Sequence, residues 1–196
     1  MTPETPTTAA ALSVATRYYS PALLNHCVRS YLWAATYGTA RGIAFDDELL
    51  YVAALLHDIG LTEPFDSHHL PFEEAGGHMA WTFAVASGWP PHRAARAAEI
   101  IVQHMHSDVS PAADPESHLL QVASSWEVAG RHADAFPPDS RTDLLARYPR
   151  LGFGAEFLAC FQDQAARKPD SPAGASVRTD VATRIATNPL DSHPAT

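Results

Sequence analysis

The chain has 196 residues, and 13 lysines and arginines against 22 aspartates and glutamates give a net charge of −9 with its 11 histidines taken as neutral. This acidic balance disfavours a nucleic-acid partner, because affinity for nucleic acids rests mainly on contacts between cations and phosphates. The length and the 46% of hydrophobic residues predict one globular domain that buries about 70% of the surface of its unfolded chain.

The two cysteines, Cys27 and Cys160, lie far apart and form no CxxC motif, so neither a disulfide framework nor a thiolate zinc site is predicted. No lysine or arginine precedes Arg17, whereas a signal peptide begins with basic residues. No apolar run approaches the roughly 18 residues of a membrane span. We therefore expect a cytoplasmic protein without a membrane partner, and its oligomeric state, with a homo-oligomer as one option, stays open.

The sequence is expected to divide into a flexible arm, one helical domain and a tail. The arm is residues 1–16, which are rich in threonine, alanine and proline; the domain is residues 17–190; the tail is residues 191–196. Strand signals are scarce, and helical periodicity runs through most of the domain. No internal repeat, heptad run or basic tract interrupts it, so we expect an all-α bundle.

Capping residues mark the first two helices of the domain. The serine and proline at 20–21 are typical of a helix start, and this helix is expected to end before Gly42. Asp46 can cap a second helix, which runs to His57 and Asp58 and is apolar nearly all round, hence central. Further helices are expected at residues 71–88, 90–106, 114–130, 139–147, 155–167 and 177–186.

The strongest chemical signal is the doublet of His57 and Asp58, which follows an apolar run and precedes Gly60. At the end of a buried helix, an imidazole and a carboxylate are costly unless each has a partner. A divalent cation is such a partner. The alternative, a histidine capped by its neighbour at a helix C-terminus, is disfavoured by the apolar run in front and the glycine behind.

His26 and Glu127 complete a pattern that resembles the HD-domain superfamily of metal-dependent helical hydrolases. In that superfamily a histidine on an early helix precedes the His-Asp doublet, and an aspartate follows on a later helix. His26 matches the first position, and His57 and Asp58 match the doublet. The late position is Glu127 here, one methylene longer. The resemblance implies His26, His57, Asp58 and Glu127 as metal ligands, or the first three with water.

Three motifs in order resemble the cyanamide hydratase-like branch of this superfamily. They are His-x-x-Arg-x-Tyr from residue 26, Leu-Leu-His-Asp-Ile-Gly at residues 55–60 and Phe-Glu-x-x-Gly from residue 72. The resemblance implies an HD-domain helical bundle of about six to eight helices. It also implies a mononuclear metal, usually zinc, that activates water for addition to a small nitrile-like carbon.

Three or four nitrogen and oxygen ligands leave a coordination position for that water, whose pKa zinc can lower to about 7. Asp58 would be both a ligand and part of the catalytic centre. Glu73 is the candidate proton shuttle, with a solvated carboxylate in a first helical turn as the equal alternative. Arg29, on the same helical face as His26, is the basic residue that can be placed near the site. Iron, manganese or nickel would accept the same ligands.

His78 and His104 fall between the doublet and the late carboxylate, where some members of the superfamily hold a second metal. Dinuclear iron oxygenases use such a set. Taken singly, each of these histidines is more often exposed or hydrogen-bonded than metal-bound, and either could line the pocket as a partner of substrate or water. The other histidines, including His106 and His132, are expected to be mostly solvated.

Four functions are compatible with these patterns. The first is a hydratase or hydrolase acting on a small, neutral, nitrile-like or amide-like molecule. The second is a phosphohydrolase for a nucleotide or small phosphate ester, which is disfavoured because Leu61 stands where many phosphate-cleaving members carry a lysine. The third is a dinuclear iron oxygenase. The fourth is a non-catalytic ligand-binding module in which the change to Glu127 marks lost catalysis.

Overall fold

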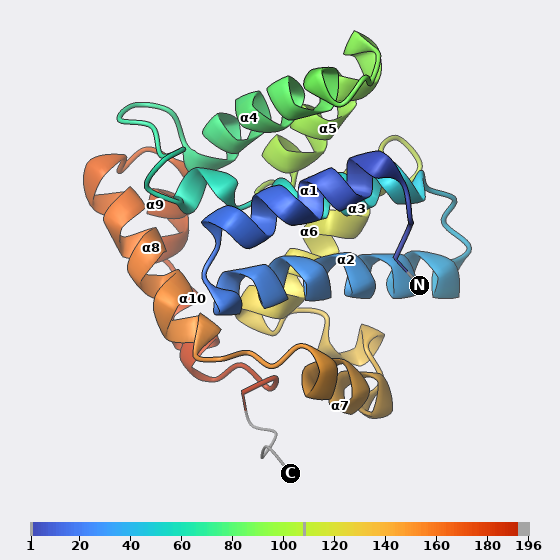
Figure 1. Cartoon of the computed structure of the whole chain (residues 1–196). Coiled ribbons are helices and arrows are strands. Elements are labelled where there is room, and N and C mark those ends of the chain that lie inside the picture. The colour runs from blue at the N-terminus through green and yellow to red at the C-terminus, as the bar shows by residue number, and fades with distance from the viewer. Residues whose placement is uncertain (1, 108, 192–196) are drawn as a thin grey trace.

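The computed structural model describes residues 2–107 and 109–191. Over these residues the chain forms ten α-helices, two short 3-10 helices and no strand, which confirms the all-α prediction. The α-helices are α1 (Pro6–Tyr18), α2 (Pro21–Arg41), α3 (Asp47–Leu56), α4 (Phe72–Ala86), α5 (Pro91–Gln103), α6 (Pro115–Ala129), α7 (Pro138–Arg147), α8 (Phe153–Arg167), α9 (Pro172–Val177) and α10 (Val181–Ala186). The 3-10 helices are Ile59–Leu61 and Ala133–Ala135. Figure 1 shows α2 running across the molecule, with the pair α4 and α5 on one side and α7 on the other.

Helix α2 begins and ends where its capping residues predict. The Ser20 hydroxyl accepts a hydrogen bond from the Leu23 amide at 3.1 Å. At the other end, Gly42 has a φ of 66°, a left-handed conformation that glycine adopts without steric cost. The first half of α2 carries His26 and Arg29 into the interior, where both are buried.

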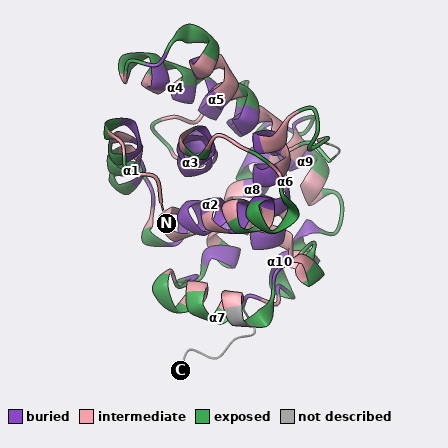
Figure 2. Ribbon diagram, turned by 90° about the vertical axis from the view of Figure 1, so that its right-hand side faces the viewer, coloured by how far each residue is buried: buried purple, intermediate pink, exposed green. Residues whose placement is uncertain are grey.

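Helix α3 lies at the centre of the bundle, as its apolar sequence predicts. Asp46 caps it by accepting a hydrogen bond from the Leu49 amide at 3.0 Å. Every residue from Leu49 to Leu56 is buried. Figure 2 shows α3 end on, surrounded by α1, α2 and α5. The helix ends just before the doublet, so His57 and Asp58 lie in the turn that follows it.

Helices α4 and α5 form a hairpin that packs beside α3 (Figure 1). Helix α4 begins at Phe72, so Gly77 lies inside it. A Cβ atom at Gly77 would lie 3.2 Å from the Ala98 carbonyl oxygen of α5, and one at Gly60 would lie 2.1 Å from the Phe72 carbonyl oxygen. These glycines therefore allow α4 to approach both α5 and the turn that carries the doublet.

The N-terminal segment is helical, so the prediction of a flexible arm over residues 1–16 is wrong. Helix α1 starts with a capping box in which the Thr5 and Thr8 side chains each accept a hydrogen bond from the other residue's amide. Ala11 and Ala15 are fully buried, and α1 packs on α3. Small side chains let the two helices lie close together, and composition alone does not show such a contact.

The last three helices pack on one another and close one side of the bundle. Helix α10 also contacts α6, which lies far from it in the sequence. The single helix predicted at residues 177–186 is divided between the end of α9 and α10. Of the predicted tail, residues 192–196 lie outside the described part of the chain. None of the helices described is long and apolar enough to cross a membrane.

Candidate metal centre

Three buried side chains converge where α2 passes the end of α3. His26 comes from α2, and His57 and Asp58 come from the turn after α3. The Nε2 atoms of the two histidines lie 3.2 Å apart. The Oδ2 atom of Asp58 lies 3.2 Å from Nε2 of His26 and 3.3 Å from Nε2 of His57. All three residues are at most 1% exposed. We call them the His-His-Asp cluster.

Acceptors outside the cluster orient both imidazole rings. Nδ1 of His57 lies 2.7 Å from the Ala54 carbonyl oxygen, and Nδ1 of His26 lies 3.3 Å from Oε2 of Glu127. Because a carbonyl and a carboxylate accept hydrogen bonds, the proton of each neutral ring belongs on Nδ1. The Nε2 lone pairs of the two rings then face each other and the Asp58 carboxylate.

The Asp58 carboxylate indicates that the cluster fits a metal ion. Both of its oxygens are buried, and neither has a hydrogen-bond partner among the described residues. Burial raises the pKa of Asp58, but His57 and His26 outweigh burial and lower the pKa to about 2, so the group is ionised. A buried carboxylate beside two imidazole lone pairs is costly without a positive partner. Two nitrogens and one oxygen within 4.8 Å of one another suit a divalent ion with open coordination positions.

The two histidines of the cluster differ in their affinity for protons. Burial lowers the pKa of His26, but the carboxylates of Asp58 and Glu127 outweigh burial and raise the pKa above its usual value. Burial also lowers the pKa of His57, and here the lowering prevails. His57 is therefore neutral at neutral pH, the form in which a histidine binds a metal.

Glu127 lies against the opposite edge of the His26 ring, outside the cluster. Its Oε1 accepts hydrogen bonds from Nε of Arg29 at 2.9 Å and from Nε1 of Trp33 at 2.7 Å. Its Oε2 accepts from Nη2 of Arg29 at 2.8 Å and from Nη1 of Arg150 at 3.3 Å. Both oxygens of Glu127 thus bind cationic or N–H donors, and the carboxylate supports His26. This arrangement fits the alternative of three protein ligands with water, and ligation by Glu127 stays a prediction.

Arg29 lies beside Glu127 and not at the wall of the cavity. It is fully buried, does not line the cavity and donates from Nη1 to the carbonyl oxygens of Tyr148 at 3.0 Å and Pro149 at 3.2 Å. Burial raises the pKa of Glu127, but Arg29 and then His26 and Arg150 lower it well below its usual range. Arg29 thus neutralises Glu127 instead of facing a substrate.

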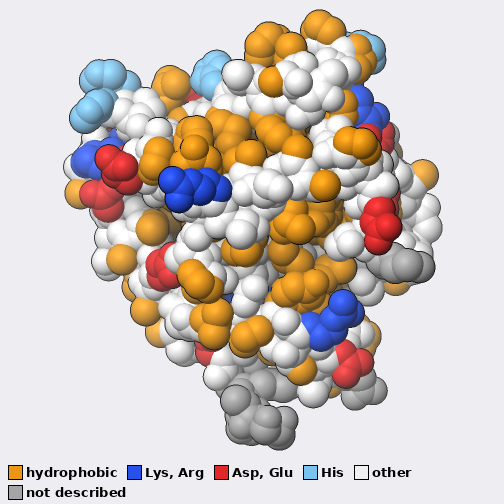
Figure 3. Space-filling model, viewed as in Figure 1, with side chains coloured by type: hydrophobic (Ala, Val, Ile, Leu, Met, Phe, Trp, Pro, Cys, Tyr) orange, Lys and Arg blue, Asp and Glu red, His pale blue; other side chains and the backbone are white. Residues whose placement is uncertain are grey.

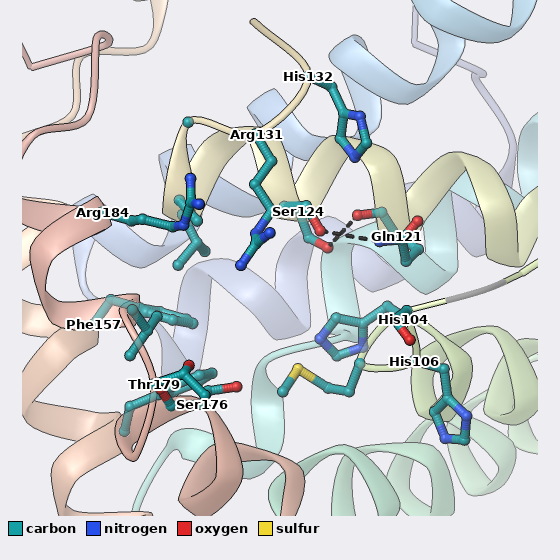
Figure 4. A pocket seen from close by; sticks show the side chains of 18 of the residues that line it. His104, His106, Gln121, Ser124, Arg131, His132, Phe157, Ser176, Thr179 and Arg184 are labelled. Atoms are coloured by element: carbon teal, nitrogen blue, oxygen red, sulfur yellow. Dashed lines mark hydrogen bonds between the residues drawn. The ribbon is translucent and has the colours of Figure 1, made fainter.

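The cluster forms the buried end of a cavity of about 710 Å³. Figure 4 shows the side chains around it, including Gln121 and Ser124 from α6, Phe157 from α8 and Arg184 from α10. A cavity of this size is typical of sites for small molecules.

His104 reaches the cavity, whereas His78 does not. The ring centres of His104 and His57 lie 4.9 Å apart. Burial and the nearby His57 lower the pKa of His104 to about 3, and its Nδ1 bonds to the Ile101 carbonyl oxygen. His78 is exposed on α4, one position after Gly77, which faces α5; successive residues of a helix point about 100° apart. The structure therefore does not assemble the predicted second metal site from these two histidines.

Glu73 is buried in the first turn of α4, at 2% exposed, so the alternative of a solvated carboxylate is wrong. Its Oε2 has no hydrogen-bond partner among residues 2–107 and 109–191, and burial raises its pKa to about 7. A carboxyl with this pKa can give and take protons near neutral pH. Because Glu73 does not line the cavity, its role as a proton shuttle stays a prediction.

The mouth of the cavity carries charged residues that no sequence pattern marks. Arg131 follows α6 and is 48% exposed, and Arg184 lies on α10 and is 40% exposed. His106 and His132 are exposed, as expected, and they also line the cavity. These residues come together because α10 packs on α6, a tertiary contact for which the sequence holds no spacing rule.

Comparison with known proteins agrees with this geometry. Residues 23–129 match the HD domain family, and this region contains the whole His-His-Asp cluster and Glu127. Two proteins of Saccharomyces cerevisiae, cyanamide hydratase DDI2 and cyanamide hydratase DDI3, are each 26% identical to this chain over 151 residues. Each match covers 75% of this chain and 67% of the relative.

Proposed function

This chain belongs to the HD domain family, and we propose that it is a metal-dependent hydratase or hydrolase acting on a small nitrile-like or amide-like molecule. The observation that carries the proposal is the His-His-Asp cluster at the buried end of the cavity. The likeness to two proteins named cyanamide hydratases supports the substrate class. We propose zinc as the ion, although iron, manganese or nickel would accept the same ligands. The proposed setting is the cytoplasm.

Within the cluster, His26 and His57 would hold the ion through Nε2, and Asp58 through its carboxylate. Such an ion, when bound, supplies water that is nucleophilic at neutral pH and a Lewis acid for the substrate. The Ala54 carbonyl and the Glu127 carboxylate keep the two rings oriented toward the ion by binding their Nδ1 atoms.

The walls beside the cluster would exclude bulk water and orient the substrate. Phe157 and Phe161 are 4% and 3% exposed and line the cavity together with the cluster. Apolar walls lower the local dielectric, which strengthens the stabilisation of negative charge that develops during the reaction. His104 is neutral, and its Nδ1–H donates a hydrogen bond to the Ile101 carbonyl oxygen, so its Nε2 can accept a hydrogen bond from an N–H group of the substrate. Glu73 is the proposed proton shuttle.

Two alternative functions receive less support. A dinuclear iron centre that uses His78 needs a side chain that is exposed on α4 and does not line the cavity. A phosphohydrolase needs a cation near the reacting phosphate, and Arg29 is bound to Glu127 instead. The mononuclear hydratase or hydrolase is therefore the function that the geometry supports best.

The proposal is tested by metal content and product formation together. We expect the purified protein to hold about one equivalent of a divalent metal and to release urea from cyanamide or products from a panel of nitriles and amides. His57→Ala should lose the metal and more than about 100-fold of the activity, because even groups that merely support a ligand contribute about 10- to 100-fold. The matched control is His92→Ala, since His92 is exposed on α5 away from the cavity. Full activity in His57→Ala would contradict a metal mechanism.

A further inference from the structure

The cavity is far larger than the smallest substrate that the proposed function allows. Cyanamide has three non-hydrogen atoms and would displace on the order of two water molecules, each with a share of about 30 Å³ of liquid volume. The cavity measures about 710 Å³, well inside the range of roughly 300 to 1,000 Å³ for sites that bind larger small molecules. A substrate that fills this cavity therefore extends from the cluster toward the mouth.

The two ends of the cavity differ in burial and in charge. At the inner end, the three residues of the His-His-Asp cluster are at most 1% exposed. At the mouth, Arg131 and Arg184 are 48% and 40% exposed. Figure 4 shows these two arginines near each other, across the cavity from His104. A long substrate bound at the cluster would bring its other end to the arginines.

A single carboxylate lies between the two arginines. Nε of Arg184 donates a hydrogen bond to Oδ2 of Asp180, and Nη2 of Arg131 lies 3.6 Å from Oδ1 of the same carboxylate. Two cations against one anion leave one positive charge in excess. The other side-chain N–H groups of these arginines make no hydrogen bond to the described residues, so they are available to a ligand.

This positive charge is local. The chain as a whole carries −9, and on the face shown in Figure 3 side chains of both signs lie scattered among hydrophobic and neutral ones. At the mouth, burial and the positive charge of Arg131 lower the pKa of His132, which reports a cationic environment there. The arginine pair is thus a specific feature of the mouth and not part of a general basic surface.

Resting on the proposed function, we infer that the substrate carries an anionic group, a carboxylate or a phosphate, which Arg131 and Arg184 bind at the mouth while the reacting group lies at the His-His-Asp cluster. A planar guanidinium suits binding of either anion through two hydrogen bonds. Asp180 holds the arginines in place in the free protein. Gln121 and Ser124 line the wall of α6 and offer polar contacts to the part of the substrate in between.

The inference is tested by anion affinity in the metal-loaded protein. Inorganic phosphate and acetate are titrated calorimetrically into the wild type, the double variant Arg131→Gln/Arg184→Gln, and the control Arg147→Gln. Arg147 is exposed at the end of α7 and does not line the cavity. Loss of charge-assisted hydrogen bonds predicts at least about tenfold weaker binding in the double variant and unchanged binding in the control. The anion that loses more affinity in the double variant identifies the substrate's group as phosphate or carboxylate.

Two results would overturn the inference. One is that neither anion binds the wild type up to about 10 mM, a concentration that fills even weak sites. The other is equal affinity in the wild type and the double variant, which would place the anion at the metal and not at the arginines.

Failure of the proposed function gives a different result. If the protein binds the anion through its arginines but transforms no nitrile or amide, the anion site stands and the proposed reaction is contradicted. If the protein hydrates cyanamide and the double variant binds anions as tightly as the wild type, the proposed reaction stands and the anion site is contradicted.

Discussion

The ring of His26 separates two buried groups of ionisable side chains whose polar atoms are hydrogen-bonded to very different degrees. At its Nε2 edge, with both rings neutral, the His57 ring and the Asp58 carboxylate present lone pairs to one another, and neither Asp58 oxygen has a hydrogen-bond partner among the described residues. At its Nδ1 edge, the Glu127 carboxylate accepts hydrogen bonds from Arg29 and from neighbouring N–H groups. Burial is nearly complete on both sides, so the balance of donors and acceptors is what distinguishes them.

This difference separates a structural role from a metal-binding one. A buried charge network in which every group is hydrogen-bonded can be part of the fold by itself. A buried group of acceptors without donors is costly unless a ligand supplies positive charge, which is why such groups mark functional sites. Asp58 and Glu127 both match acidic positions of the HD pattern, yet the structure makes the first a ligand candidate and the second a support.

The hydrogen-bonded group at the Nδ1 edge of His26 can be disrupted by removing the Glu127 carboxylate. Glu127→Ala leaves the buried Arg29 without its anion, whereas Arg150 keeps its pair with Asp191. We expect the variant to lower the free energy of unfolding by about 3–5 kcal/mol. Urea unfolding of the metal-free protein measures the change separately from metal binding. A loss below about 1 kcal/mol would contradict the structural role of Glu127.

The matched control for this variant is Glu99→Ala. Glu99 also pairs with an arginine, Arg96, at 2.7 Å, but it is 57% exposed. Exposed pairs of this kind contribute about 0–1 kcal/mol, so the control should unfold almost as the wild type does. The difference between the two variants measures what burial adds to the same chemical change.

Glu73 sharpens the comparison, because it is a buried carboxyl with a partnerless oxygen but no neighbouring imidazole pair. Burial raises its pKa from 4.5 to about 7 in the folded protein. Between these pH values the unfolded chain releases the proton that the folded chain retains, so rising pH destabilises the folded state. Glu73→Gln removes this effect and should raise the free energy of unfolding by roughly 2–3 kcal/mol above pH 7.

The gain in Glu73→Gln should shrink as the pH falls from 7 and vanish below about pH 4, where both states are protonated. Thermal unfolding of the wild type and the variant across this pH range measures how the gain in stability changes with pH. The same variant should lose activity if Glu73 moves a proton in the reaction. A stability gain that does not depend on pH would mean that the surroundings of Glu73 do not raise the pKa of its carboxyl group.

The smallest effect is expected at His78. Because this side chain is exposed on α4 and does not line the cavity, His78→Ala should leave the metal content near one equivalent and stability within about 0.5 kcal/mol. Elemental analysis and urea unfolding measure both quantities. Loss of a second equivalent of metal in this variant would restore the dinuclear alternative.

Local sequence determined the elements that form the centre of the site. The caps at Ser20, Asp46 and Gly42 and the helical spacing of apolar residues predict α2 and α3, and these helices carry His26 and the doublet to one place. Such signals are readable because a cap or a helical period depends on residues within a few positions of one another.

The direction of the acidic side chain on α6 could not be predicted in the same way. Glu127 turns toward Arg29 and Arg150, and the second of these lies 23 positions later in the chain. Likewise, His104, which directly follows α5, faces the cavity and His78 on α4 faces solvent, although both fall between the same motifs. Which face of a helix is buried depends on the neighbouring helix that packs against it.

By itself, therefore, the sequence determined an all-α fold and a His-Asp doublet at the end of its central helix, because both follow from interactions over a few residues. Only the tertiary structure decided that Glu127 supports His26, that His104 and not His78 reaches the cavity, and that Arg131 and Arg184 meet at its mouth. These outcomes depend on contacts between segments distant in the chain, above all the packing of α10 on α6, and side-chain neighbours across such contacts are set by the geometry of the whole bundle.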